Sequence, residues 1–128
     1  PENNVEERIE ALEELWELSG IDLYKPLITL PEFGILSKIQ KILMDEDHPV
    51  LHQYSLGCLW YLTRDATNRL LFCKPENIPL LHLMMRLLRQ EHPNSDMIRS
   101  FLLNCSLSKE THSILLSPQI GYVEMLQT

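Results

Sequence analysis

Two histidines stand where they could bind a metal ion. His48 and His52 are four residues apart and lie next to Asp45, Glu46 and Asp47. Residues four apart share one face of a helix, and imidazole and carboxylate groups are common zinc ligands. The same acidic residues suit a helix N-terminus, where the helix dipole favours negative charge. We favour the helix cap over the metal site, and we expect no metal or cofactor.

The candidate nucleophiles are three cysteines, Cys58, Cys73 and Cys105. Each lies in a leucine-rich segment, whereas a catalytic thiol needs an exposed and electropositive setting. Their odd number and the lack of a Cys-x-x-Cys spacing disfavour a disulfide framework. The chain also lacks the Gly-rich phosphate loop, the GxSxG motif and the HExxH motif. We expect reduced core thiols in an intracellular protein that is not an enzyme.

Length and charge narrow the class of protein further. The chain has 128 residues, of which 45% are hydrophobic, so it can form one domain over residues 1–128 with a real core. Its net charge of −7 disfavours nucleic-acid binding, because affinity for phosphate depends on Lys and Arg. No apolar run approaches the roughly 20 residues needed to cross a bilayer. We therefore expect a cytoplasmic location, with the nucleus as an alternative, and no membrane partner.

Helix is the dominant pattern along the chain. Apolar residues recur every three to four positions, and no alternating strand pattern extends beyond a few residues. Proline, glycine and short polar runs end the apolar segments. Pro31 suits the first turn of a helix, because its missing N–H would have no partner there. We expect helices over 5–19, 31–43, 50–64, 67–73, 78–88, 96–107, 109–117 and 119–127.

A Leu-x-x-Leu-Trp-x-Leu run occurs twice, 44 residues apart, beginning at Leu12 and again at Leu56. The offset continues beyond it, because the Pro-Glu pair at 31–32 recurs at 75–76 and the His-Pro pair at 48–49 recurs at 92–93. A fixed period in the forties, filled by helices and cut by turns, is typical of an α-solenoid. Equivalent helices would then pack against equivalent neighbours one layer further along.

The run TNRLLFCKPENIPLLHLMMRLL at 67–88 resembles the armadillo repeat. Its Asn-Arg-Leu-Leu part resembles the short first helix of that family, and Ile-Pro-x-Leu resembles the start of the second. The Leu-Trp-x-Leu runs resemble the third. The resemblance implies an all-α, right-handed α-α superhelix of about three stacked repeats with a period of 44, and HEAT-like stacking is the close alternative. Residues 5–19 would be the third helix of a preceding unit or an N-terminal cap, 21–64 and 66–107 repeats, and 109–128 a partial repeat.

In armadillo proteins the third helices line a concave groove that holds an extended peptide. The resemblance implies such a groove here, with five candidate partner-binding residues: Trp16, Gln53, Trp60, Arg64 and Asn104. Tryptophan supplies a large apolar face, and an asparagine amide can bond a peptide backbone. A tryptophan among leucines also suits a core, and the sequence leaves both alternatives open. The asparagine that often follows the family's tryptophan is replaced by Gly20 and Arg64, which weakens the case for importin-like recognition of basic nuclear-localisation peptides.

We therefore expect a non-catalytic scaffold that binds a peptide or helix of another protein along this groove. The alternative is a structural segment of a longer helical-repeat protein that mediates oligomerisation or assembly through its ends. Residues 126–128 stop inside a helical pattern, which suits a fragment, and the apolar C-terminal end suits self-association. A mild basic edge is formed by Lys38, Lys41, Arg86 and Arg89, for which we favour the interpretation of a solvated polar stripe.

Overall fold

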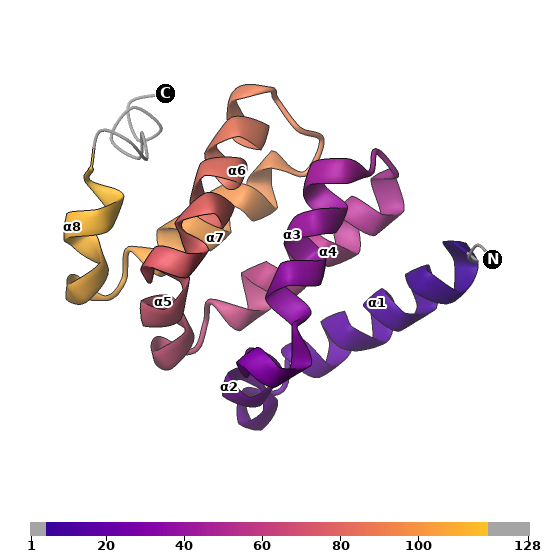
Figure 1. Cartoon of the computed structure of the whole chain (residues 1–128), viewed down its shortest axis with the longest axis horizontal. Helices are drawn as coiled ribbons and strands as arrows, with labels where there is room; N and C mark the ends of the chain where they lie inside the picture. Colours follow the sequence, from indigo (N-terminus) through magenta and orange to yellow (C-terminus); the bar gives the residue numbers. More distant parts are fainter. Residues whose placement is uncertain (1–4, 118–128) are drawn as a thin grey trace.

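Helices account for every regular element in the described part of the chain (Figure 1). The structure is a computed structural model and describes residues 5–117. Within that range the chain forms α-helices and short 3₁₀ turns and contains no strand. The predicted all-α class is confirmed.

The helices lie close to their predicted positions. Their bounds are α1 (Val5–Ser19), α2 (Lys25–Ile28), α3 (Ile35–Asp45), α4 (Pro49–Leu62), α5 (Ala66–Phe72), α6 (Ile78–Arg89), α7 (Ser95–Cys105) and α8 (His112–Leu115). Four 3₁₀ turns precede α2, α3, α6 and α8: η1 (Asp22–Tyr24), η2 (Pro31–Phe33), η3 (Pro75–Asn77) and η4 (Lys109–Thr111). The helix predicted over 109–117 is thus a 3₁₀ turn followed by one short helix. The helix predicted over 119–127 lies outside the described residues.

The helix predicted to open at Pro31 begins four residues later. Pro31 starts the 3₁₀ turn η2, and α3 begins only at Ile35. Between them Gly34 has a φ of 63°, a left-handed conformation that glycine adopts without a Cβ clash. Pro75 opens η3 in the same way, 44 residues further on. Proline fixes φ and lacks a donor, so it suits the first position of either kind of turn.

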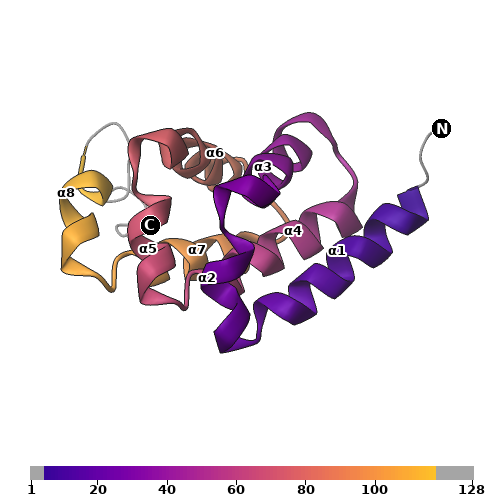
Figure 2. The same ribbon diagram turned by 60° about the horizontal axis from the view of Figure 1, so that its bottom comes forward.

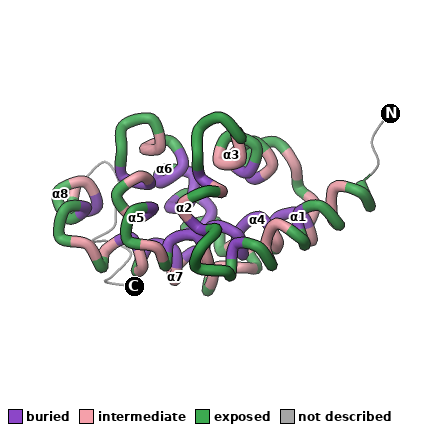
Figure 3. The backbone as a smooth tube through the Cα atoms, turned by 90° about the horizontal axis from the view of Figure 1, so that it is seen from below, coloured by how far each residue is buried: buried purple, intermediate pink, exposed green. Residues whose placement is uncertain are grey.

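Two sets of helices lie on opposite sides of the molecule (Figures 2 and 3). Along one side α1 lies against α4, and α4 lies against α7. On the other side α3 packs on α4 and α6 packs on α7. α1 begins at residue 5 and α4 at residue 49, which is the predicted offset of 44, and η2 and η3 have the same offset. The right-handed superhelix and the bounds of the repeats remain predictions.

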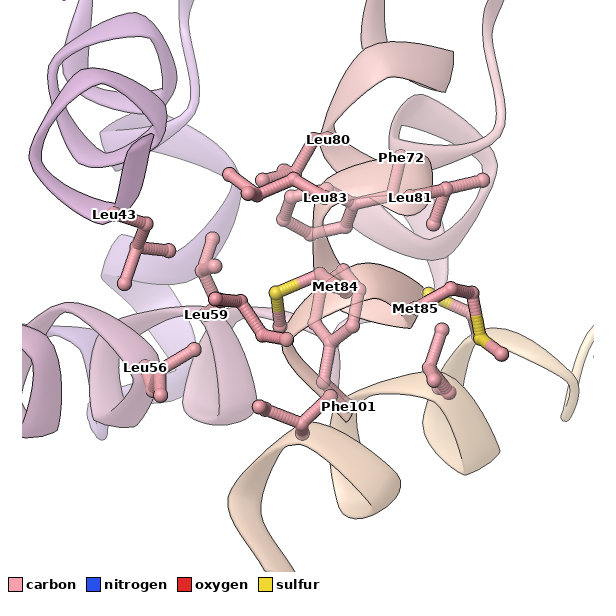
Figure 4. Packing of buried hydrophobic residues seen from close by; sticks show 14 of the residues in the cluster. Leu43, Leu56, Leu59, Phe72, Leu80, Leu81, Leu83, Met84, Met85 and Phe101 are labelled. Atoms are coloured by element: carbon pink, nitrogen blue, oxygen red, sulfur yellow. The ribbon is translucent and has the colours of Figure 1, made fainter. Parts of the chain in front are cut away.

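The core lies between these two sets of helices (Figure 4). Leu59 of α4, Met84 of α6 and Phe101 of α7 meet there, and each is 0% exposed. The ring of Phe101 also packs edge-on against Phe72 of α5, with ring centroids 5.1 Å apart. Burying one such side chain contributes roughly 1.5–3 kcal/mol relative to leaving it in water. This cluster therefore supplies much of the free energy that holds α4, α5, α6 and α7 together.

A buried asparagine joins α2, α4 and α5. Asn68 is 1% exposed, and its Nδ2 donates hydrogen bonds to the backbone oxygens of Lys25 (2.9 Å) and Leu62 (3.0 Å). Its Oδ1 accepts a hydrogen bond of 2.7 Å from Thr29 Oγ1. A buried amide left without partners would cost roughly 1–3 kcal/mol, so this pairing stabilises the contact among the three helices. In the Asn-Arg pair that resembles the armadillo repeat, the asparagine therefore has a structural role.

Candidate functional site

The candidate site is a hollow between α1 and α4, which we call the aromatic groove. Its volume is about 650 Å³. The residues that line it are Glu13, Trp16, Glu17, Gly20, Ile21, Gln53, Tyr54, Tyr61 and Arg64. The aromatic rings come from both helices, so packing of α1 on α4 builds the groove.

Trp16 forms the floor of the aromatic groove and is half-buried. Its ring lies 5.3 Å from the ring of Tyr54 and 5.9 Å from that of Tyr61, measured between centroids. Between these tyrosines α4 carries Gly57, and a Cβ added there would lie 2.4 Å from Trp16 Cε2. The indole thus rests directly on the backbone of α4. Trp16 Nε1 is buried and has no hydrogen-bond partner within residues 5–117.

Arg64 closes one end of the aromatic groove. Its guanidinium carbon lies 4.9 Å from the centre of the Trp60 ring and 5.0 Å from that of Tyr61. Cation–π contacts of this kind contribute roughly 0.5–1 kcal/mol at exposed sites. Arg64 is itself exposed, whereas Trp60 is half-buried. The charge is therefore held in place while its outer side stays open to a ligand.

The structure brings three of the five predicted residues together. Trp16, Gln53 and Arg64 line the aromatic groove. Trp60 does not line it, but contacts two of its residues, since Arg64 lies over the indole and the Tyr61 ring is 5.4 Å away. Asn104 lies on α7 outside the groove, and its Nδ2 donates a 3.2 Å hydrogen bond to Thr63 Oγ1. Of the five residues predicted to bind a partner, three therefore line one pocket, Trp60 lies beside that pocket, and Asn104 lies outside it.

Sequence reasoning missed the two tyrosines. Tyr54, Gly57 and Tyr61 are spaced by three and four, which places them on one face of α4. An aromatic–glycine–aromatic stripe on a helix was therefore the signal that could have identified this face. On α1, Glu13 and Glu17 are exposed at the groove, opposite the positive charge of Arg64, which lies in the turn after α4. The rim thus has an acidic side and a basic end.

The His48/His52 pair is engaged in other contacts. His48 is the N-cap residue of α4, and its Nδ1 accepts a 3.3 Å hydrogen bond from the Val50 backbone N–H. Both ring nitrogens of His52 are occupied, one by His92 Nε2 at 2.8 Å and one by the Glu46 backbone oxygen at 2.5 Å. Among residues 5–117 no group of three or more His, Cys, Asp and Glu side chains could hold a metal ion. The segment does cap α4 as predicted, but His48 makes the cap, because Asp45 ends α3 and the first turn of α4 carries no acidic residue.

The three cysteines are buried and free. Burial raises the pKa of the Cys58 thiol to about 12. A hydrogen bond with Cys73 and then burial raise the pKa of Cys105 well above its usual value. Since the thiolate is the nucleophilic form, Cys58 and Cys105 are protonated and inert at neutral pH. The prediction of core thiols is confirmed.

Comparisons with protein-family models, with curated proteins and with solved structures each find no match to this chain. The likeness to the armadillo repeat therefore depends on the residues quoted above. None of the helices in residues 5–117 is both long enough and apolar enough to cross a bilayer.

Proposed function

We propose that this chain is a non-catalytic protein-interaction module that binds an extended segment of a partner protein in the aromatic groove. The single observation that carries the proposal is the convergence of Trp16, Gln53 and Arg64 with two tyrosines around one hollow of about 650 Å³. Tryptophan, tyrosine and arginine are the residue types that most often dominate binding energy at protein interfaces.

The geometry favours a ligand with a defined sequence of side chains. The tyrosine and tryptophan rings offer apolar area at a low cost in side-chain entropy, because neighbouring rings already hold them. The exposed carboxylates of Glu13 and Glu17 suit a basic residue of the ligand, and Arg64 suits an acidic one. We infer a peptide with an apolar residue over Trp16, flanked by charges of opposite sign.

We also propose that the helices continue the armadillo-like superhelix. The support is the 44-residue offset between the starts of α1 and α4 and between η2 and η3. In that arrangement α1, α4 and α7 are the third helices, so a groove between α1 and α4 would lie on the side that the resemblance implies. Three buried thiols without a disulfide suit an intracellular protein.

The test is selection of peptide ligands from a random display library, followed by affinity measurement. A selected peptide is titrated with wild type and with the variants Arg64→Ala and Gln53→Ala, both at exposed positions that leave the core unchanged. We expect Arg64→Ala to weaken binding about tenfold, which corresponds to about 1.4 kcal/mol. Gln53→Ala should weaken it less, because the lost hydrogen bond is neutral.

The matched control is Arg86→Ala, which removes an exposed arginine from α6 on the other side of the molecule. Its affinity for the peptide should equal that of wild type. Selected peptides that bind both groove variants as tightly as wild type would show that the aromatic groove is not the binding surface.

A further inference from the structure

A second groove, separate from the aromatic groove, lies between α1 and α3. Its volume is about 540 Å³, and a further hollow of about 500 Å³ continues it, with Leu15 and Ile35 lining both. We call the two together the α1–α3 groove. Three apolar residues from each helix form the floor of its first part: Ala11, Leu12, Leu15, Ile35, Ile39 and Ile42. Leu15 follows Ala11 by four positions and Leu12 by three, and the three isoleucines are spaced by four and three, so each helix contributes one continuous apolar face.

One layer further along the chain, a helix fills the equivalent place. Adding 44 to Leu12 and Leu15 gives Leu56 and Leu59 of α4, and both of these are 0% exposed. α3 packs on that side of α4, with Leu43 pointing toward the two leucines (Figure 4). On α1, by contrast, Leu15 is only half-buried and lines an open hollow. Within residues 5–117, α1 has no counterpart of α3 over this face.

The charged side chains that line the α1–α3 groove carry a net positive charge. Lys38 and Lys41 both line it and are exposed, and neither forms an ion pair within residues 5–117. Arg8 also lines the groove, but its Nη1 donates a 2.9 Å hydrogen bond to Glu46 Oε1, so that charge is compensated. An occupant with carboxylates beside its apolar stripe would complement the two lysines.

We propose that the α1–α3 groove binds an amphipathic α-helix of a partner protein, with a stripe of isoleucine and leucine and an acidic flank. α3 illustrates the apolar pattern that fits, since Ile39 and Leu43 are its buried residues. The ligand differs in conformation from the extended segment proposed for the aromatic groove, and the two surfaces do not share a lining residue. Variants can therefore change one surface without altering the lining of the other.

The probe is a stapled helical peptide with the α3 sequence ILSKIQKILMD, in which glutamate replaces both lysines. Its binding to residues 1–128 is measured by fluorescence anisotropy at low ionic strength. We expect saturable binding that weakens about tenfold or more with Ala11→Glu, which places a carboxylate in the apolar floor. The double variant Lys38→Glu with Lys41→Glu should weaken it comparably, and added salt should reduce the difference from wild type.

Two controls separate this groove from other surfaces. Reversing the exposed arginines of α6 with Arg86→Glu and Arg89→Glu is the matched charge change, and Arg64→Ala alters only the aromatic groove. Both should leave the affinity for the stapled peptide unchanged. Circular dichroism checks the folding of each variant. The lysine pair keeps the test valid if Ala11→Glu fails to fold, because both lysines are exposed.

Three results would overturn the proposal. The first is equal binding of a peptide with serine in place of the isoleucines and leucines of the stripe. The second is unchanged affinity in both groove variants. The third is a dimer of the chain alone, measured by sedimentation and dissociated by Ala11→Glu, because a second copy would then occupy the groove.

Discussion

At Gly57 the missing side chain decides where Trp16 lies. The indole rests on the α4 backbone between Tyr54 and Tyr61, and no other residue type leaves that space free. Adding 44 to Gly57 gives Phe101, which is fully buried. At the α7 position that is equivalent to Gly57, a large side chain thus replaces the glycine. Trp60 packs instead beside Tyr61 and under Arg64. Two tryptophans at equivalent positions in the sequence therefore have different neighbours.

Gly57→Ala should destabilise the protein even though alanine is the better helix former. Helix propensity favours alanine over glycine by about 1 kcal/mol. The new Cβ would lie 2.4 Å from Trp16 Cε2, so the indole would have to move. We expect a net loss of about 1–3 kcal/mol in the free energy of unfolding, measured by urea denaturation.

A second background tests this explanation. In Trp16→Leu, where the indole is absent, Gly57→Ala should be neutral or stabilising. If Gly57→Ala stabilises the protein that retains Trp16, the close contact is not the reason for the glycine.

Among the elements, a chain of hydrogen bonds joins the turns that follow α3 and α6. His92 Nδ1 accepts from the Asn94 backbone N–H at 3.0 Å, so the ring proton is on Nε2 and is donated to His52 Nδ1. His52 in turn donates from Nε2 to the Glu46 backbone oxygen. Both rings are therefore neutral in this arrangement. A proton added to His92 would go to Nδ1, where it would face the Asn94 backbone N–H that now donates to that nitrogen.

The stability of the fold should fall in acid because of this contact. Burial, and next the nearby His52, hold the pKa of His92 below its usual value, while Asp47 acts in the opposite direction. The unfolded chain then binds the proton more readily, so stability is complete above the unfolded histidine pKa of about 6.5 and falls as the pH drops below it. Urea denaturation at a series of pH values should show this loss.

His92→Gln should flatten that pH dependence, because the titrating ring is gone. The matched control is His82→Gln, which removes an exposed histidine from α6. It should keep the full dependence. Parallel curves for wild type and His92→Gln would mean that another group controls the acid response.

Across the whole molecule, the free energy of local opening should differ from one helix to the next. The buried apolar cluster draws its members from α3 to α8, whereas Leu12 is the buried hydrophobic residue that α1 contributes. Stacked helical units are stabilised mainly by their neighbours, so a helix with a partner on fewer sides opens at a lower free energy.

Hydrogen exchange should therefore divide the helices into two classes. We expect the amides of α4 and α6 to exchange only through global unfolding, and those of α1 to exchange sooner through local opening. Exchange measured by mass spectrometry or NMR at neutral pH tests this. Equal opening free energies for α1 and α4 would contradict it and would indicate one fully cooperative unit.

Much of the helical framework could be predicted from local patterns. Apolar periodicity located α1, α4, α5, α6 and α7, because each helix buries a face whose spacing follows its own turn. The offset of 44 also paired Pro31 with Pro75, although Pro31 was expected to open a helix and both prolines instead open 3₁₀ turns. Helix ends are stabilised by groups within a few residues, so they are readable in one stretch of sequence.

The shape of the candidate site depends instead on how α1 crosses α4. The resemblance to the armadillo repeat implied that Trp16, Gln53 and Arg64 share a groove, but it did not select the tyrosines or exclude Asn104. The sequence left open whether each tryptophan belongs to the core or to a groove. Tertiary packing made Trp16 half-buried, because Gly57 lets the two helices approach and leaves one side of the ring open. A contact between residues about 40 positions apart depends on all the side chains between the helices, and no local pattern contains that information.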